Sequence, residues 1–496
     1  MAGILKGEIM DKSPGIKKNY LYRLLYDILT MITPFITAPY VSRVLGADGI
    51  GIYSYTQSYM TYLSMFAVLG TASYGTREIA RCRNDKYEYS KKFWEIELLT
   101  VFTTSICLLI WLGIIIFVKK YQIYFVALVP SLFAAMFDIS WFYTGCETIG
   151  YMILGNSIWK LLGVVCIFLV IKNNNDLFLY ILINTTMLLS ANLSMWIFLP
   201  KMLIRINVKE LNFKIHFKET LIYFIPTIAT SIYTVLDKTL IGAITQNEYE
   251  NGYYEQATKI INMAKTAVFG AVNSVMGARI SFLFSENRVN EIKQRLRKSV
   301  DFILLLGFGA MFGIIGVSQT FVPVFFGEGY EAVINILYCM SPLIIIIGIS
   351  NCLGAQYYTP AGLRAESAKY IIIGSFVNLI MNLIFIPTLG SIGATVGSII
   401  AELTIAILYL IRCNGYLTVN YICIVSYKRV LAGIVMSLAV YFIGKFWKNP
   451  GVTSLIVQII TGASLYFTLL FILKDKLQTE FTQIIIKKIL YRGVKN

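Results

Sequence analysis

Apolar stretches long enough to cross a lipid bilayer alternate with short polar segments along almost the whole chain. A helix rises about 1.5 Å per residue, so roughly 20 apolar residues cover a hydrocarbon core of about 30 Å. Fourteen stretches fit, near residues 20–44, 50–74, 95–118, 122–144, 151–171, 177–200, 219–243, 254–277, 299–325, 333–355, 369–388, 391–411, 430–447 and 452–473. The segments between them are short. The pattern therefore predicts an all-α, polytopic membrane protein of about 14 transmembrane helices.

Composition and charge agree with this prediction. The mean hydropathy is +0.68 and 57% of the residues are hydrophobic, which excludes an ordinary soluble domain. The net charge is +16, but 33 of the 43 lysines and arginines fall in alternate connecting segments and at the chain ends. This asymmetry follows the positive-inside rule if both termini are cytoplasmic, and it predicts a multi-pass protein of the cell membrane. The basic charge therefore reflects topology, and no nucleic-acid partner is expected.

Three features recur in the same order in the two halves of the chain. A proline interrupts a predicted helix. A three-residue segment that starts with glycine opens the next helix, and a three-residue segment that starts with glycine and ends with arginine closes it. The pairs are Pro34 and Pro226, Gly51-Ile52-Tyr53 and Gly252-Tyr253-Tyr254, and Gly75-Thr76-Arg77 and Gly277-Ala278-Arg279. They predict two six-helix lobes in a parallel repeat, 1–208 and 209–415, followed by 416–496 with two extra helices and a basic cytoplasmic tail. Parallel repeats of this kind are typical of transporters with a central substrate site.

Polar residues line one face of the eighth stretch. Glu255, Lys259, Asn262, Thr266 and Asn273 share that face at 100° per residue, and Lys265 lies beside it. The matching face of the second stretch is polar but uncharged, with Ser54, Gln57, Thr61, Ser64 and Thr71. A lysine at mid-bilayer costs a few kcal/mol or more unless it meets water or an anion. We therefore expect a wet, cationic cavity lined by helices 1, 2, 7 and 8, although Lys259 has the alternative of reaching the membrane interface.

Three carboxylates in the predicted helices are candidates for binding a coupling cation: Asp27, Asp237 and Glu255. Simple ion pairing is the alternative for the first two, because Arg23 precedes Asp27 by one helical turn and Lys238 follows Asp237. The single histidine, His216, is expected to be solvated in the basic segment 201–218.

Motifs for enzymatic chemistry are missing from the sequence. There is no GxxxxGK[ST] sequence for nucleotide binding, and the predicted outer loops are short, with no cluster of His, Asp or Glu. The eight cysteines show no CxxC spacing and are read as small apolar residues. We therefore predict a protein that is not an enzyme and has neither a cofactor nor a metal.

Four blocks of sequence resemble a known family. They are Pro39-Tyr40-Val41-Ser42-Arg43-Val44-Leu45-Gly46-Ala47-Asp48-Gly49-Ile50-Gly51-Ile52-Tyr53-Ser54-Tyr55, then Ser73-Tyr74-Gly75-Thr76-Arg77-Glu78-Ile79-Ala80, then Asp138-Ile139-Ser140-Trp141-Phe142-Tyr143-Thr144-Gly145-Cys146-Glu147, and finally Gly393-Ala394 to Glu402. Their order is similar to that in Wzx-type polysaccharide flippases of the multidrug/oligosaccharidyl-lipid/polysaccharide exporter superfamily. Asp27 departs from the pattern, since many relatives carry glutamine there, which puts a family-wide role of this position in doubt.

The resemblance implies that the protein moves undecaprenyl-diphosphate-linked oligosaccharide repeat units from the inner to the outer leaflet by alternating access. On this interpretation the polar path contains Lys265, Lys259, Asn262 and Gln57. Arg77 and Arg279, at the cytoplasmic ends of helices 2 and 8, would meet the incoming diphosphate or simply anchor those ends. Arg43 would either cap helix 1 or meet phosphate on the outer side.

The partners implied are the lipid-linked oligosaccharide, membrane lipid, a polysaccharide polymerase and a chain-length regulator. Three alternatives remain open: a cation-coupled drug exporter, a lipid II flippase of the same superfamily, and a non-transporting scaffold of a polysaccharide synthesis complex. The lysines of the eighth stretch argue against an exporter of cations.

Overall fold

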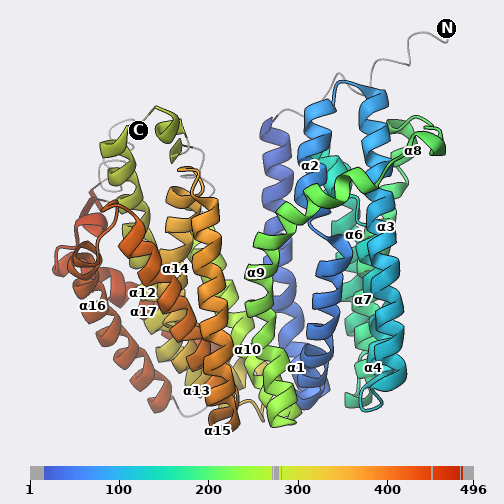
Figure 1. Cartoon of the computed structure of the whole chain (residues 1–496). Coiled ribbons are helices and arrows are strands. Elements are labelled where there is room, and N and C mark those ends of the chain that lie inside the picture. Colours follow the sequence, from blue (N-terminus) through green and yellow to red (C-terminus); the bar gives the residue numbers. More distant parts are fainter. Residues whose placement is uncertain are drawn as a thin grey trace, which may run out of the picture. The chain divides into compact units, whose positions relative to one another are not determined.

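The computed structural model describes residues 16–270, 272, 279–280, 282–286, 288–447, 451–480 and 482–483. Every regular element in these ranges is helical (Figure 1), which confirms the all-α fold class. The chain divides into two compact units, Met1–Thr239 and Leu240–Asn496. Asn273 of the polar face, Gly277-Ala278 of the repeat and most of the basic tail lie outside the described residues.

The first unit is a bundle of nine helices among the described residues, the last of which continues a few residues beyond the unit. They are α1 (Ile16–Val68), α2 (Thr71–Cys82), α3 (Lys86–Phe117), α4 (Gln122–Met136), α5 (Ser140–Gly145), α6 (Ile149–Val170), α7 (Leu177–Trp196), α8 (Leu199–Met202) and α9 (Lys214–Thr245). Short 3₁₀ turns, η1 (Asn174–Asp176) and η2 (Val208–Glu210), complete its connections. Within this unit α4 and α6 both pack on α7, and α2 packs on α5.

The second unit starts with α10 (Glu248–Lys265) and a π-helical turn, η3 (Thr266–Gly270). It continues through α12 (Val289–Phe326), α13 (Ala332–Met340), α14 (Leu343–Leu353), a second π-helical turn η4 (Gly354–Tyr358), α15 (Arg364–Arg412), α16 (Val419–Phe446) and α17 (Val452–Ile472). Helices α12, α16 and α17 pack on one another within it.

Ten helical segments among the described residues are long and apolar enough to cross a membrane. Two of them, Leu21–Cys82 and Arg364–Arg412, each carry two of the predicted stretches. The two predicted stretches outside these ten segments lie on α9 and on α10 with its continuation. The protein is therefore a multi-pass membrane protein, and its ten long helical segments are compatible with 14 predicted crossings.

Left-handed residues mark the bends where consecutive stretches join. Gly46 (φ 69°) interrupts α1 and Gly390 (φ 55°) interrupts α15, a conformation that glycine adopts without a steric cost. Gln246 (φ 50°) takes the same role between α9 and α10. At the second bend Glu250 closes the turn, because its Oε2 accepts a hydrogen bond from the backbone N–H of Ser391 at 2.8 Å. This carboxylate caps the start of the helix that follows.

Two of the sequence blocks that carry the family resemblance meet where α2 packs on α5. A Cβ on Gly75 would lie 2.4 Å from the Trp141 ring, and one on Gly145 would lie 2.8 Å from Ile79. Trp141 is 3% exposed and stacks on Phe93 of α3, with ring centroids 5.5 Å apart. The glycines therefore allow α2, α3 and α5 to approach closely, and this packing fixes the helix that carries Arg77.

Candidate functional site

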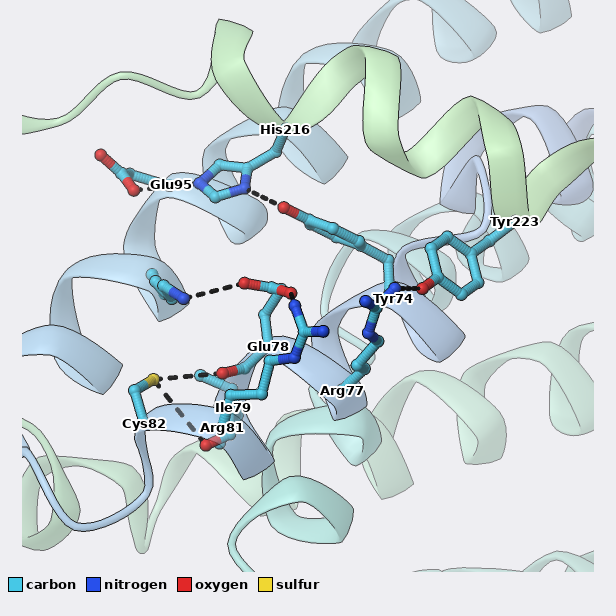
Figure 2. Close-up of polar contacts among 10 residues, drawn as sticks. Tyr74, Arg77, Glu78, Ile79, Arg81, Cys82, Glu95, His216 and Tyr223 are labelled. Atoms are coloured by element: carbon cyan, nitrogen blue, oxygen red, sulfur yellow. Dashed lines mark hydrogen bonds and ion pairs between the residues drawn. The ribbon is translucent and has the colours of Figure 1, made fainter. Parts of the chain in front are cut away.

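Arg77 lies on α2, an amphipathic helix that begins directly after the left-handed Gly70 (φ 76°). The backbone of α9 packs on this glycine: a Cβ there would lie 2.9 Å from both the carbonyl oxygen of Thr220 and the amide nitrogen of Phe224. No larger residue fits this approach without movement of α9. The site is therefore built where α2, α3 and the first turns of α9 meet (Figure 2).

A buried chain of hydrogen bonds joins these three helices. His216 on α9 contacts the Tyr74 hydroxyl on α2 through Nδ1 at 2.6 Å and the Glu95 carboxylate on α3 through Nε2 at 3.0 Å (Figure 2). Glu95 also accepts a hydrogen bond from the backbone N–H of Asn212 at 2.9 Å. His216 is only 5% exposed, so the prediction that it is solvated is wrong. A basic segment predicts exposure on average, but this residue faces inward at the start of α9.

Arg77 is exposed and donates a hydrogen bond from its guanidinium to the hydroxyl of Tyr223 on α9 (Figure 2). On the same helix, Glu78 forms ion pairs with Lys92 of α3 at 2.8 Å and with Arg81 at 3.1 Å. The carboxylate of Glu78 is thereby compensated by other cations. The guanidinium of Arg77 is hydrogen-bonded to a neutral hydroxyl and interacts electrostatically with Glu78 and Glu219.

Charged side chains of α10 have partners inside the second unit. Lys259 pairs with Glu255 one turn earlier, with Nζ 3.5 Å from the carboxylate. Lys265 is half-buried at the end of the helix and interacts electrostatically with Glu402 of α15. Asn262 is exposed between the two lysines. Lys259, predicted to bind an anion, and Glu255, predicted to bind a cation, are thus each other's partners in one ion pair.

The remaining predicted anion contacts lie apart along the chain. Gln57 is half-buried on α1, and its side-chain oxygen has no hydrogen-bond partner among the described residues. Arg43 is exposed and donates to the backbone carbonyl of Pro39 at 3.2 Å, a contact of the kind expected for a cap. Arg279 is exposed, with its guanidinium 5.4 Å from the Phe282 ring centroid.

The two other coupling-ion candidates differ in burial. Asp27 is exposed on α1, whereas Asp237 on α9 is only 4% exposed and interacts electrostatically with Tyr62. Only a buried carboxylate changes its environment strongly when it gains or loses a cation. In the part of the chain that the structure describes, no group of three or more His, Cys, Asp or Glu side chains could hold a metal ion.

Sequence reasoning missed the aromatic and acidic partners of these cations. Tyr74 and Tyr223 sit in helices rich in aromatic residues, so nothing singles them out before the fold is known. Glu402 and its neighbour Lys265 are more than a hundred residues apart in sequence, so their interaction is not visible before the fold is known. His216 is the single histidine of the sequence, and this alone could have marked it as a candidate for a specific contact.

Comparison with known proteins identifies the family. A family model described as polysaccharide biosynthesis protein matches residues 16–277, and a second, described as lipid II flippase MurJ, matches residues 163–462. The chain belongs to the polysaccharide biosynthesis protein family. It is a Wzx-type member of the superfamily inferred from the four sequence blocks.

Curated relatives match between about half and four fifths of this chain. An Escherichia coli K12 protein described as an O-antigen transporter is 23% identical over 414 residues, covering 81% of this chain and 98% of the relative. A Haloferax volcanii protein, described as a flippase of low-salt glycan biosynthesis, is 25% identical over 274 residues, covering 53% of this chain and 55% of the relative.

Solved structures share the fold. An inward-closed lipid II flippase MurJ superimposes with a TM-score of 0.72 at 16% identity, covering 92% of this chain and 99% of that one. An inward-facing multidrug transporter of the MATE family gives a TM-score of 0.60 at 14% identity, covering 83% of this chain and 98% of that one. Both matches concern the fold, which is the membrane-transporter fold expected for this family.

Proposed function

We propose that this Wzx-type protein is a flippase that carries undecaprenyl-diphosphate-linked oligosaccharide repeat units across the cytoplasmic membrane, from the inner to the outer leaflet. The observation that carries the proposal is the pair of lysines on α10, inside an apolar chain whose relatives are described as transporters and flippases of glycans. A diphosphate does not cross hydrocarbon at a useful rate. Transport of such a lipid therefore requires a polar, cationic path for its headgroup through the protein.

The direction of transport follows from the topology that we propose. The basic segments lie on the cytoplasmic side with both termini, so Arg77 and Arg279 stand at the end where the lipid-linked sugar is made. Arg77 is exposed and held by a neutral tyrosine, which suits the first contact with phosphate. The polyprenyl chain stays in lipid while the headgroup enters.

Binding of the diphosphate can affect the conformation because it replaces the carboxylate partners of the two lysines. Phosphate oxygens compete with Glu255 for the ammonium group of Lys259, and with Glu402 for that of Lys265. When a carboxylate is displaced it needs a new cation or a proton, because an uncompensated charge inside a membrane protein is costly. Loading of the diphosphate is therefore linked to cation uptake at Glu255, and we keep Asp237 as a second buried carboxylate for that role.

Flipping in reconstituted liposomes tests the proposal. Undecaprenyl-diphosphate oligosaccharide is placed on one leaflet, and its exposure to a membrane-impermeant probe on the other is followed with and without the protein. We expect transfer that requires the protein. Efflux of a cationic drug in the same vesicles, without lipid transfer, would contradict the proposal and identify a drug exporter.

Lipid II is the second candidate substrate, because the lipid II flippase model covers residues 163–462. It has the same carrier and diphosphate, and only the headgroup differs. Parallel vesicles loaded with lipid II separate the two: faster transfer of lipid II than of the oligosaccharide lipid would favour this candidate. A protein that inserts normally and transfers neither lipid would be a scaffold.

A further inference from the structure

One acidic side chain in the first unit lacks the partner that its burial requires. Glu97 of α3 is 2% exposed, and neither of its carboxylate oxygens has a hydrogen-bond partner among the described residues. Phe93 and Ile96, its neighbours along α3, belong to a buried apolar cluster that also contains Ile139 and Trp141. An ionised carboxylate in such surroundings costs far more than a neutral one, so a cation must neutralise it.

The charged group that interacts with Glu97 is negative. The Asp138 carboxylate, in the turn between α4 and α5, is close enough to interact electrostatically with it. Two acidic groups near the start of α3 have partners of their own: Glu78 of α2 is ion-paired with Lys92, and Glu95, on a different face of α3 from Glu97, is bound to His216. No described lysine or arginine forms an ion pair with Glu97, and the charge of a second carboxylate acts on it.

A second buried group nearby is also unpartnered. Trp141 stacks on Phe93, one helical turn before Glu97, and its indole Nε1 has no hydrogen-bond acceptor among the described residues. Asp138, three residues before Trp141, is half-buried and accepts a hydrogen bond from the Ser140 N–H at 2.9 Å. The surroundings of Glu97 thus include an unpaired acceptor, an unpaired donor nearby and the partly exposed carboxylate of Asp138, through which water can approach.

From this geometry we propose that Glu97 is a proton-binding site of the first unit, with Asp138 as the group through which the proton enters and leaves. The ligand is a proton, since a hard metal cation takes about six or more oxygen ligands and the residues next to Glu97 along α3 belong to an apolar cluster. The step is a proton transfer alone: the carboxylate of Glu97 gains H⁺ and becomes a neutral acid, and it returns H⁺ when water reaches it.

The site gives the flippase a means of using a proton gradient, and this consequence rests on the proposed function. While Glu97 is neutral, α3 packs on α4, and its Phe93 stacks on Trp141 of α5, as observed. Once it is ionised, its repulsion from Asp138 favours an arrangement in which water enters between these helices. Proton binding therefore favours the observed packing of α3 on its neighbours, in the first unit that also carries Arg77.

Infrared difference spectroscopy of the full-length protein in lipid nanodiscs tests the assignment without any transport assay. At neutral pH we expect the carbonyl stretching band of a protonated carboxylic acid, lost in Glu97→Gln and kept in Glu147→Gln. Glu147 is the matched control because its side chain is 59% exposed and pairs with Arg83. The band should be the same in sodium and in potassium salts.

Each other outcome overturns the assignment. A spectrum without the band, or a band that Glu97→Gln leaves intact, would place the proton elsewhere. A band that sodium removes and potassium does not would make Glu97 a sodium site. Failure of Glu97→Gln to fold would also contradict the proposal, because this variant copies the neutral acid in shape. None of these results depends on whether the protein transfers lipid.

Discussion

Gly75 has no side chain because Trp141 occupies the space where one would lie. The sequence block around this glycine was recognised by resemblance, yet only the structure gives the physical reason for it. A methyl group at position 75 would have to displace a buried indole that is stacked between helices. Packed interiors resist such insertions, since the surrounding helices have little room to move.

Replacement of Gly75 by alanine should therefore destabilise the first unit by about 1–3 kcal/mol. The matched control is Gly113→Ala on α3, where nothing lies within 4 Å of the added carbon and the helix gains a better helix former. Thermal unfolding of the purified protein in detergent compares the two. A midpoint that falls in both variants, or in neither, would contradict this account of Gly75.

The cations of α10 show how far sequence reaches at the residue scale. Helical periodicity placed Glu255 and Lys259 on one face, and their spacing of one turn made the observed ion pair foreseeable. The interaction of Lys265 with Glu402 was not foreseeable, because it joins α10 to α15 across a long stretch of sequence. Residues that are close in sequence can be paired from periodicity alone, whereas distant pairs need the fold.

At the scale of elements, α9 is fixed to α2 and α3 by one histidine. His216 bridges Tyr74 and Glu95, so its removal leaves a buried hydroxyl and a buried carboxylate without their partner. Hydrophobic periodicity predicts α9 as a membrane helix but says nothing about where its first turn docks. The basic residues around His216 conceal that turn in a segment that looks solvated.

We expect His216→Ala to lower the free energy of opening the first turns of α9 by about 1–3 kcal/mol. Backbone amides of residues 212–223 should then exchange with deuterium roughly tenfold faster or more, since about 1.4 kcal/mol corresponds to a factor of ten. Hydrogen exchange measured by mass spectrometry reports this directly. Lys214→Ala, an exposed change in the same turn, is the control, and equal exchange in both variants would refute the bridging role.

A second buried contact joins the two extra helices predicted in 416–496 to the rest of the second unit. Arg429 of α16 is 1% exposed, bonds to Asp475 just beyond α17 at 3.1 Å, and donates to the backbone carbonyl of Asp301 on α12 at 2.8 Å. Sequence alone identifies Arg429 only as one more basic residue near a helix end. Its burial shows that it ties α16 and α17 to the core of the second unit.

Replacement of Arg429 by methionine should destabilise the second unit by about 3–5 kcal/mol, because it strands the buried charge of Asp475. The neighbouring Lys428→Met removes a partly exposed cation of similar length that bonds a backbone carbonyl and lies 5.8 Å from the Tyr427 ring centroid, and it should cost much less. Chemical denaturation of the two variants in detergent gives the comparison. Similar stability of Arg429→Met and wild type would show that the network contributes little.

At the scale of the whole molecule, hydropathy and charge gave the number of stretches and the proposed orientation. Hydropathy and charge are properties of each segment by itself, so both can be read without knowledge of the fold. They could not reveal the left-handed glycines at which consecutive helices bend, Gly46 within α1 and Gly390 within α15. Nor could they reveal Glu97, which reads as one more acidic residue at the start of a membrane helix. The predicted lobe boundaries remain a prediction.

Lys265 offers the most direct test of the central claim, a cationic path for a diphosphate headgroup. The rate of transfer of undecaprenyl-diphosphate oligosaccharide between leaflets would be measured in liposomes with wild type, Lys265→Ala and Lys160→Ala. Lys160 is the matched control, a half-buried lysine of α6 whose ammonium lies 5.7 Å from the Tyr26 ring centroid. The account predicts a loss of about tenfold or more in Lys265→Ala, or about 1.4 kcal/mol, and little change in Lys160→Ala. Equal rates in Lys265→Ala and wild type would contradict the path through α10.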